Sequence, residues 1–219
     1  MRSRRKLKRD LDMGTAELII NEAERIIGEA GLEKFRLQDI ADSIGIQFPS
    51  LYTHFRGKQE ILLCIVERSV DALSHLFADA ESAPPEKLLK IGVERLVEHF
   101  AENIAQVRLL LLDFSMAAGM PEFNRIAGKP GEFLREESPL QPMFMRLTRI
   151  LQYGEECGVF KSVNPHIFFI NIFGIILVRL ALSRPYPNHK TNPEAYRTLV
   201  ANLQMQMTEV ATAMLEPEC

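Results

Sequence analysis

The sequence contains no tryptophan, and its three cysteines, Cys64, Cys157 and Cys219, lie far apart. An odd number of scattered cysteines excludes a disulfide framework and provides no zinc-ligand spacing. Such cysteine usage is typical of the reducing cytoplasm, so we expect a cytoplasmic protein. The N-terminus is basic but has no apolar run behind it, which argues against a secretory signal.

Signals for β-structure and for a membrane span are also scarce. No sustained apolar–polar alternation occurs, and there is no Asn-Gly or Asp-Gly hairpin turn. The longest apolar run extends from Ile167 to Leu182 and includes Asn171 and Arg179. Because a span needs about 20 apolar residues, this shorter run predicts a buried helix.

Residue patterns typical of catalytic sites are also missing. We find no Gly-rich phosphate loop, no metal-ligand pair and no nucleophile elbow. His54 has no Cys, Asp or Glu beside it at ligand spacing. We therefore expect neither an enzyme nor a bound metal or cofactor.

The net charge of −3 gives no sign of nucleic-acid binding for the chain as a whole. The first nine residues, however, hold six basic side chains: Arg2, Arg4, Arg5, Lys6, Lys8 and Arg9. We interpret residues 1–13 as a basic arm, which is either simply solvated or touches phosphates.

What is abundant is helical periodicity, which predicts an all-α fold. Apolar residues recur at spacings of three and four over residues 16–30, 37–44, 48–55 and 62–77. Further helices are expected at about 86–101, 104–118, 143–156, 165–183 and 193–215, with a loop holding at most a short helix at 122–142. Pro165 and Pro193 suit first-turn positions, where no backbone N–H is needed.

Residues 36–58, RLQDIADSIGIQFPSLYTHFRGK, contain two short amphipathic segments joined at Gly45-Ile46. Neither segment is long enough to be a stable helix alone, so both must pack on the helix expected at 16–30. Three short helices with a sharp turn between the last two form a helix-turn-helix, whose last helix enters the major groove of DNA.

The outward residues of that last helix suit contact with DNA. Gln47 and Ser50 can reach base edges, and the ring of Pro49 can touch a thymine methyl group. Tyr52, Thr53 and His54 can reach phosphates through their polar ends, and Arg36 and Lys58 add charge at neighbouring helix starts.

These residues resemble the signature of the tetracycline-repressor (TetR) family. The resemblance rests on the glycine turn at Gly45, on Pro49-Ser50-Leu51-Tyr52-Thr53-His54-Phe55 and on Lys58-Gln59-Glu60-Ile61-Leu62, and it covers about residues 14–63. It implies that Tyr52, His54 and Lys58 hold the phosphate backbone. It also implies that Gln47, Phe48, Pro49 and Ser50 lie nearest the bases.

Two positions depart from the family pattern. Phe48 stands where a small or polar residue is common, and its spacing with Leu51, Tyr52 and Phe55 favours a core position over an apolar base contact. Arg36 stands where a capping Thr or Ser is common, so an N-cap is lost and a phosphate-seeking charge is gained.

The resemblance further implies a domain plan of helix-turn-helix (14–60) followed by a helical effector-binding and dimerisation domain (61–219). Two operator half-sites need two recognition helices, so a homodimer is expected, paired through helices near 143–157 and 165–182. Large flexible apolar residues suggest a pocket for an apolar or aromatic effector. The candidate lining residues are Leu110, Phe114, Met116, Phe123, Phe144, Met145, Phe169 and Phe173.

Three functions are compatible with these patterns. The first is a cytoplasmic, nucleoid-associated repressor that a small ligand releases from an inverted-repeat operator. The second is a TetR-like architectural or cell-cycle DNA-binding protein without an effector. The third is a helical enzyme or lipid-binding protein with an accidental helix-turn-helix, and the missing catalytic constellation counts against it.

Overall fold

The computed structural model describes residues 14–77, 83–127, 138–183 and 192–217, and every regular element in these ranges is helical. The expected all-α class is confirmed. The basic arm at 1–13 and most of the connection between the helices expected at 165–183 and 193–215 lie outside the described residues.

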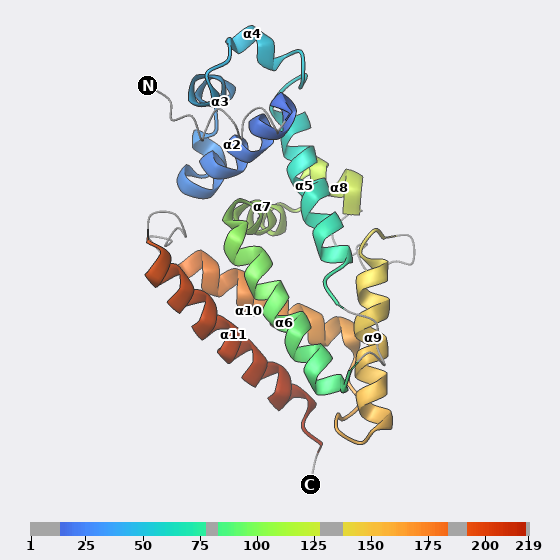
Figure 1. The fold of residues 1–219 in the computed structure, drawn as a ribbon. Coiled ribbons are helices and arrows are strands. Elements are labelled where there is room, and N and C mark those ends of the chain that lie inside the picture. The colour runs from blue at the N-terminus through green and yellow to red at the C-terminus, as the bar shows by residue number, and fades with distance from the viewer. Residues whose placement is uncertain (1–13, 78–82, 128–137, 184–191, 218–219) are drawn as a thin grey trace.

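The N-terminal helices form one end of the molecule (Figure 1). They are α2 (Thr15–Ala30), the 3₁₀ turn η1 (Leu32–Lys34), α3 (Leu37–Ile44) and α4 (Phe48–Leu51). The helices expected at 16–30 and 37–44 are confirmed. The helix expected at 48–55 stops earlier, because the N–H groups of Tyr52 and Thr53 bond three residues back, to Pro49 and Ser50, instead of four.

Helix α5 (Lys58–Ser74) connects this end to the body. It begins below residues 45–55, which we call the recognition segment, and runs to the remaining helices without a break (Figure 1). It therefore crosses the domain boundary that we expected at residue 60. Ile61 and Ile65 at its upper end and Leu73 at its lower end belong to one continuous hydrophobic core. The two parts of the chain are therefore packed as one body.

The body contains six described helices. They are α6 (Pro85–Glu102), α7 (Ile104–Ser115), α8 (Pro121–Ala127), α9 (Gln141–Glu156), α10 (Pro165–Leu182) and α11 (Pro193–Leu215). Pro165 and Pro193 occupy first positions, as predicted. The side chains of Asn164 and Asn192 cap the same two helices by accepting backbone N–H groups.

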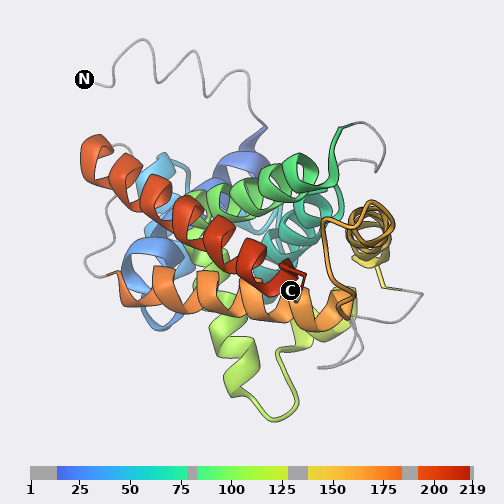
Figure 2. The same ribbon diagram turned by 90° about the horizontal axis from the view of Figure 1, so that it is seen from below.

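Helix α10 contains the apolar run from Ile167 to Leu182 that predicted a buried helix. It is long and apolar enough to cross a membrane by length and composition, yet its inner side packs on α6, α7, α9 and α11. Only a third of its residues are buried within this chain. Seen from below, α10 and α11 lie side by side along one flank (Figure 2).

A buried polar network joins the two parts of the molecule where α2 meets α7. The Glu24 carboxylate of α2 accepts hydrogen bonds from Arg68 of α5, at 3.2 Å, and from the Gln106 side chain of α7. Gln106 also lies near His99 of α6, but the Oε1 atom of Gln106 and the Nε2 atom of His99 are both buried without a hydrogen-bond partner among the described residues. Burial raises the pKa of Glu24 and lowers the pKa of His99.

The lowered pKa of His99 predicts a loss of stability in weak acid. Below a pH of about 6.5, His99 binds a proton in the unfolded chain but stays neutral in the folded chain. The free energy of unfolding therefore falls as the pH falls. Urea unfolding of a His99→Gln variant between pH 7 and pH 5 should show a shallower decline than the parent, by up to about 1.4 kcal/mol per pH unit. Parallel declines would show that His99 does not titrate between the two states.

Candidate nucleic-acid interface

Gly45 makes the turn between α3 and α4. Its φ of 74° and ψ of 37° lie in the left-handed region, which glycine adopts without steric cost. The N–H groups of Gly45 and Ile46 both bond to the carbonyl of Ala41, at 2.9 and 3.0 Å. The helix end is thereby satisfied within the turn itself, and α4 leaves α3 at a sharp angle (Figure 1).

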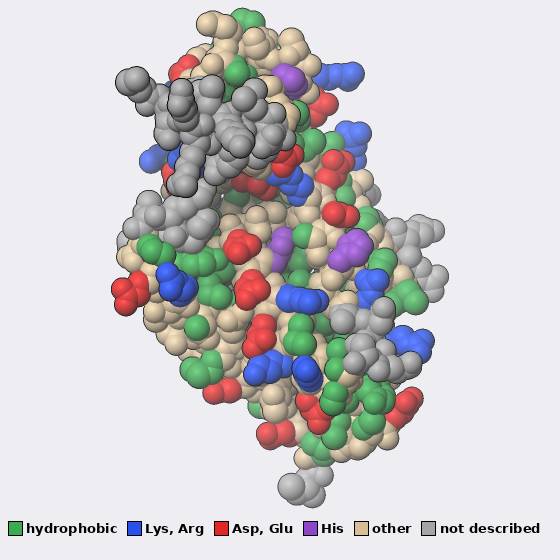
Figure 3. Space-filling view, in the orientation of Figure 1, with side chains coloured by type: hydrophobic (Ala, Val, Ile, Leu, Met, Phe, Trp, Pro, Cys, Tyr) green, Lys and Arg blue, Asp and Glu red, His purple; other side chains and the backbone are tan. Residues whose placement is uncertain are grey.

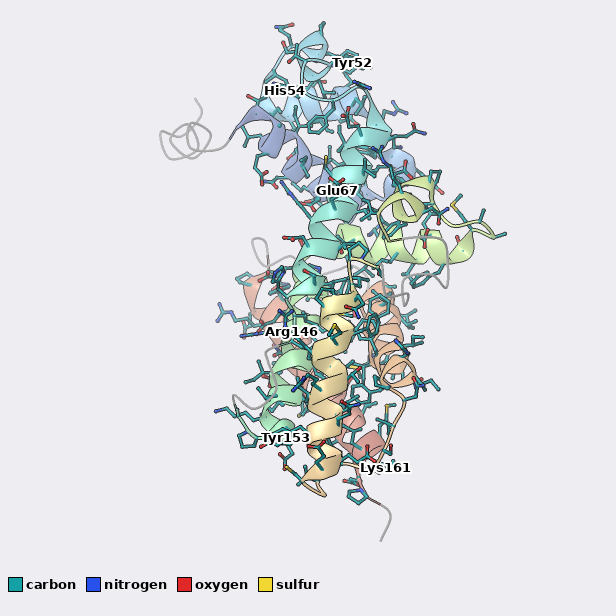
Figure 4. All side chains as sticks on the ribbon, turned by 90° about the vertical axis from the view of Figure 1, so that its right-hand side faces the viewer. Tyr52, His54, Glu67, Arg146, Tyr153 and Lys161 are labelled. Atoms are coloured by element: carbon teal, nitrogen blue, oxygen red, sulfur yellow. The ribbon has the colours of Figure 1, made fainter. Side chains whose placement is uncertain are left out.

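Two large side chains anchor the recognition segment from below. Leu51 is fully buried and Phe55 is 5% exposed, and both belong to the core formed with α2 and α5. The opposite side faces solvent, and its exposed residues are Gln47, Pro49, Ser50, Tyr52, Thr53 and His54. Figure 4 shows Tyr52 and His54 at this end of the molecule, remote from Arg146 and Tyr153 on α9.

Phe48 is not a core residue, so the expectation drawn from its spacing is wrong. Its side chain is half-buried, and it is absent from the residues that form or pack against the hydrophobic core. It contacts the ring of Tyr52 edge-on instead, with centroids 5.4 Å apart and planes at 79°. Phe48 is the first residue of a helix of four residues, so a spacing that assumed one helix over 48–55 does not apply to it.

Lys58, the expected phosphate contact on α5, is turned back toward the protein. Its Nζ donates to the carbonyls of Leu32 and Phe35, at 3.1 and 3.3 Å, and lies 4.9 Å from the centre of the Phe35 ring. Burial lowers the pKa of Lys58. Its ammonium group therefore ties α5 to the turn before α3.

Arg36 is exposed at the start of α3, where it makes no side-chain cap. Sequence reasoning missed a neighbouring contact of Glu60, whose carboxylate accepts the backbone N–H of Arg56 at 2.6 Å. Glu60 is the third residue of α5 after Gly57, and acidic residues at that position commonly bond back to the chain before the helix. This bond fixes the chain between the recognition segment and α5.

The contacts of Arg68 with α2 were also not predicted, because no local sequence pattern links Arg68 to its partners. Its guanidinium donates to Asn21 at 2.8 Å and faces the carboxylates of Glu17 and Glu24 at 2.5 and 3.2 Å. It therefore ties α5 to α2 across 44 to 51 residues of sequence, and the helix beneath the recognition segment is held from two sides.

The eight residues expected to line an effector pocket do not form one enclosed group. Phe123, Phe144 and Phe169 are buried and Leu110 and Phe173 are partly buried. Phe114, Met116 and Met145 are 57%, 43% and 55% exposed, so these three do not line an enclosed cavity within one chain. Exposure follows from their places at the end of α7 and on the outer side of α9.

Part of that group does come together as a cluster of rings. Phe169 contacts Phe144 and stacks on Phe173, with centroids 5.0 and 5.2 Å apart. Phe173 also contacts Phe100 of α6 at 5.4 Å and the exposed Phe114 of α7 at 6.3 Å. We call Phe100, Phe114, Phe144, Phe169 and Phe173 the aromatic cluster.

The described residues hold no group of three or more metal-ligating side chains. Buried Asp113 accepts the backbone N–H of Met120 at 2.5 Å. Its carboxylate therefore fixes the turn between α7 and α8.

Comparison with known sequences places the N-terminal end in a family. Residues 19–65 match the family described as bacterial regulatory proteins, tetR family. An uncharacterized HTH-type transcriptional regulator of Bacillus subtilis (strain 168), YerO, is 28% identical over 101 residues. That match spans 44% of this chain and 35% of the relative's length.

Solved structures extend the likeness to the whole fold. The ketosteroid transcriptional regulator KstR2 of Mycobacterium tuberculosis superposes with a TM-score of 0.67 at 21% identity, over 94% of this chain and 96% of that one. The TetR-family regulator PfmR of Thermus thermophilus gives 0.64 at 24% identity, over 94% and 100%. Residues 19–65 therefore form a helix-turn-helix domain of the tetR family, and the whole chain shares its fold with these regulators.

Proposed function

We propose that this regulator acts in the cytoplasm as a homodimer that binds an inverted-repeat operator, represses transcription there, and is released by a small apolar or aromatic ligand. The observation that carries the proposal is the recognition segment, which two buried side chains hold from below while six residues face solvent. A regulator of this kind needs no catalytic groups of its own.

In the proposed complex, α4 lies in the major groove. Gln47, Phe48, Pro49 and Ser50 face base edges, because they start the helix at the far end of the molecule. Arg36, Tyr52, Thr53 and His54 contact phosphates on either side. Both the hydroxyl and the backbone N–H of Thr53 donate to the carbonyl of Ser50, so Thr53 donates to a phosphate through its hydroxyl after that group rotates.

Lys58 joins the phosphate contacts only if its ammonium group leaves the carbonyls of Leu32 and Phe35. A phosphate oxygen is a charged acceptor and bonds an ammonium group more strongly than a neutral carbonyl does. We therefore expect Lys58 to hold the turn in the free protein and to turn outward on DNA.

The exposed side of α10 is the surface that we propose for dimerisation. Ile167, Ile170, Ile175, Val178 and Leu182 recur along it at helical spacing, with exposures between 36% and 74%. Helix α9 directs its apolar residues into the core, and Met145 is its one large exposed hydrophobic residue among those described. Helix α11 lies beside α10, with Arg179 bonded to Gln206 at 2.9 Å, so we place the dimer surface on α10 and α11 in place of the pairing through 143–157 and 165–182 that the sequence predicted.

The aromatic cluster is the proposed place for an effector. Its rings connect α6, α7, α9 and α10, and Phe100 contacts His99, which belongs to the polar network reaching α2. A ligand that separates these rings would move α6 and α7 and shift the population toward a different spacing of the two recognition helices. Apolar ligands should then raise the melting temperature, and a broad screen in which none does so would count against an effector.

The experiment that tests the proposed function is selection of random duplex DNA by the purified chain at near-physiological salt. Enrichment of an inverted repeat supports a dimeric, sequence-specific regulator. Salt-sensitive binding to every sequence would support an architectural DNA-binding protein instead, and no binding at all would contradict DNA recognition by the chain without a co-repressor.

Substitutions at the interface should separate backbone contacts from base contacts. Lys58→Ala should weaken binding to all sequences and reduce the slope of log affinity against log salt by about one for each lost contact. Tyr52→Phe should lower the affinity for every DNA sequence by about tenfold, because the hydrogen bond from the Tyr52 hydroxyl to a charged phosphate is lost. Gln47→Ala should change the preferred sequence, as measured by repeated selection.

Lys90→Ala is the matched control for Lys58→Ala, because it removes an exposed lysine of the body at α6. It should leave both affinity and salt slope unchanged. If Gln47→Ala kept the parental sequence preference, the placement of α4 in the groove would be wrong.

A charge on the exposed side of α10 should separate the dimer. Val178→Asp places two unpaired carboxylates in the symmetric interface, and the dissociation constant should rise at least about a hundredfold. Val159→Asp is the control, because Val159 is another exposed valine but lies in the turn after α9. Sedimentation equilibrium should find Val159→Asp dimeric and Val178→Asp monomeric, and an intact Val178→Asp dimer would exclude this surface.

A further inference from the structure

The recognition segment is free of charged side chains. Residues 45–55, from the turn to the second anchor, include no Lys, Arg, Asp or Glu. In Figure 3 the uppermost surface is largely tan and green, whereas basic and acidic side chains are spread over the body below. Any base contact from this segment therefore depends on amide, hydroxyl, imidazole or apolar groups.

This composition limits which base pairs the segment can identify. The commonest specific contact in the major groove is Arg or Lys on the O6 and N7 atoms of guanine, and Asp or Glu can accept from the N4 atom of cytosine. Neither contact is available from residues 45–55. The remaining strong contacts are an amide on adenine and an apolar group on the methyl group of thymine.

Gln47 has the chemistry for adenine. It is the residue before α4, it is exposed, and its side chain makes no capping hydrogen bond to the helix. Its amide can therefore offer one donor and one acceptor together. That pair matches N7 and the N6 amino group of adenine.

Phe48 has the chemistry for the thymine methyl group. It is the first residue of α4, it is partly buried but lies outside the core, and Tyr52 supports its ring edge-on. An aromatic ring held in this way loses little side-chain entropy on binding. Exposed Pro49 adds a second apolar surface directly beside it.

From these contacts we propose that each operator half-site carries A·T pairs beneath the start of α4, with Gln47 bonded to an adenine and the Phe48 ring against the 5-methyl group of a thymine. The proposal rests on the proposed function, since it assumes that α4 lies in the major groove. It adds the class of base pair and the atom on the base that the protein recognises.

The first test uses the inverted repeat that the full-length parent protein selects from random DNA. The bases of each half-site that α4 covers should be A·T pairs, and a half-site core of G·C pairs would overturn the proposal. If no inverted repeat is enriched, the proposed function fails, and this inference fails with it.

The second test removes single methyl groups from the selected site. Replacing the covered thymine by deoxyuridine changes nothing but the 5-methyl group. Affinity for the parent protein should fall about fourfold for one half-site and about fifteenfold for both, the effect of one buried methyl group at each site. Deoxyuridine at thymines outside the covered bases is the control and should have no effect.

Repeating the comparison with Phe48→Ala assigns the methyl contact to Phe48. The variant should bind thymine and deoxyuridine sites equally, whatever its overall affinity, because each protein is compared with itself. With cytosine at the same position, 5-methylcytosine should improve binding about fourfold for the parent and not for Phe48→Ala. Val159→Ala should retain the parental preference.

The outcomes separate this inference from the proposed function. An enriched inverted repeat whose affinity is indifferent to the methyl group would leave a sequence-specific regulator in place and overturn the role of Phe48. A methyl effect that persists in Phe48→Ala would overturn the assignment to Phe48 and point to Pro49.

Discussion

The structure depends on one constraint: helices of eight and four residues cannot hold their own shape in water. The recognition segment exists as a surface because Leu51 and Phe55 are buried against α2 and α5 and because Gly45 makes the turn above them. Lys58, Glu60 and Arg68 add polar contacts from α5 to neighbouring segments of the same chain. The outward residues are therefore free for DNA, since none of them is needed to hold the segment together.

Much of this arrangement could be predicted from local sequence. Apolar spacing located α2, α3, α6, α10 and α11 to within a few residues, and prolines marked where α10 and α11 begin. Phe48 was misplaced because its spacing assumes one helix over residues 48–55, whereas α4 contains only Phe48–Leu51. The ties of Arg68 to α2 and of Gln106 to Glu24 join residues far apart in sequence, so no periodic pattern signals them. Three of the candidate pocket residues, Phe114, Met116 and Met145, are exposed within one chain, because an apolar residue type does not say which side of a helix is covered.

The body carries two features that link the DNA-binding end to the rest of the molecule. Helix α10 keeps an apolar side that this chain alone leaves exposed, which is the form expected of a helix completed by a second copy. The aromatic cluster extends from α9 and α10 to α6, where His99 and Gln106 continue toward Glu24 on α2. In the mechanism that we propose, a change at the aromatic cluster reaches α2 through these packed residues.

The most direct test of DNA recognition by paired copies of α4 is a hydroxyl-radical footprint of the parent protein on the DNA that it selects. Two recognition helices related by two-fold symmetry should protect two patches on one face of the duplex, with centres one helical turn of about 34–36 Å apart or a multiple of it. A single protected patch, or uniform protection along the duplex, would contradict a dimer that places α4 in two successive major grooves.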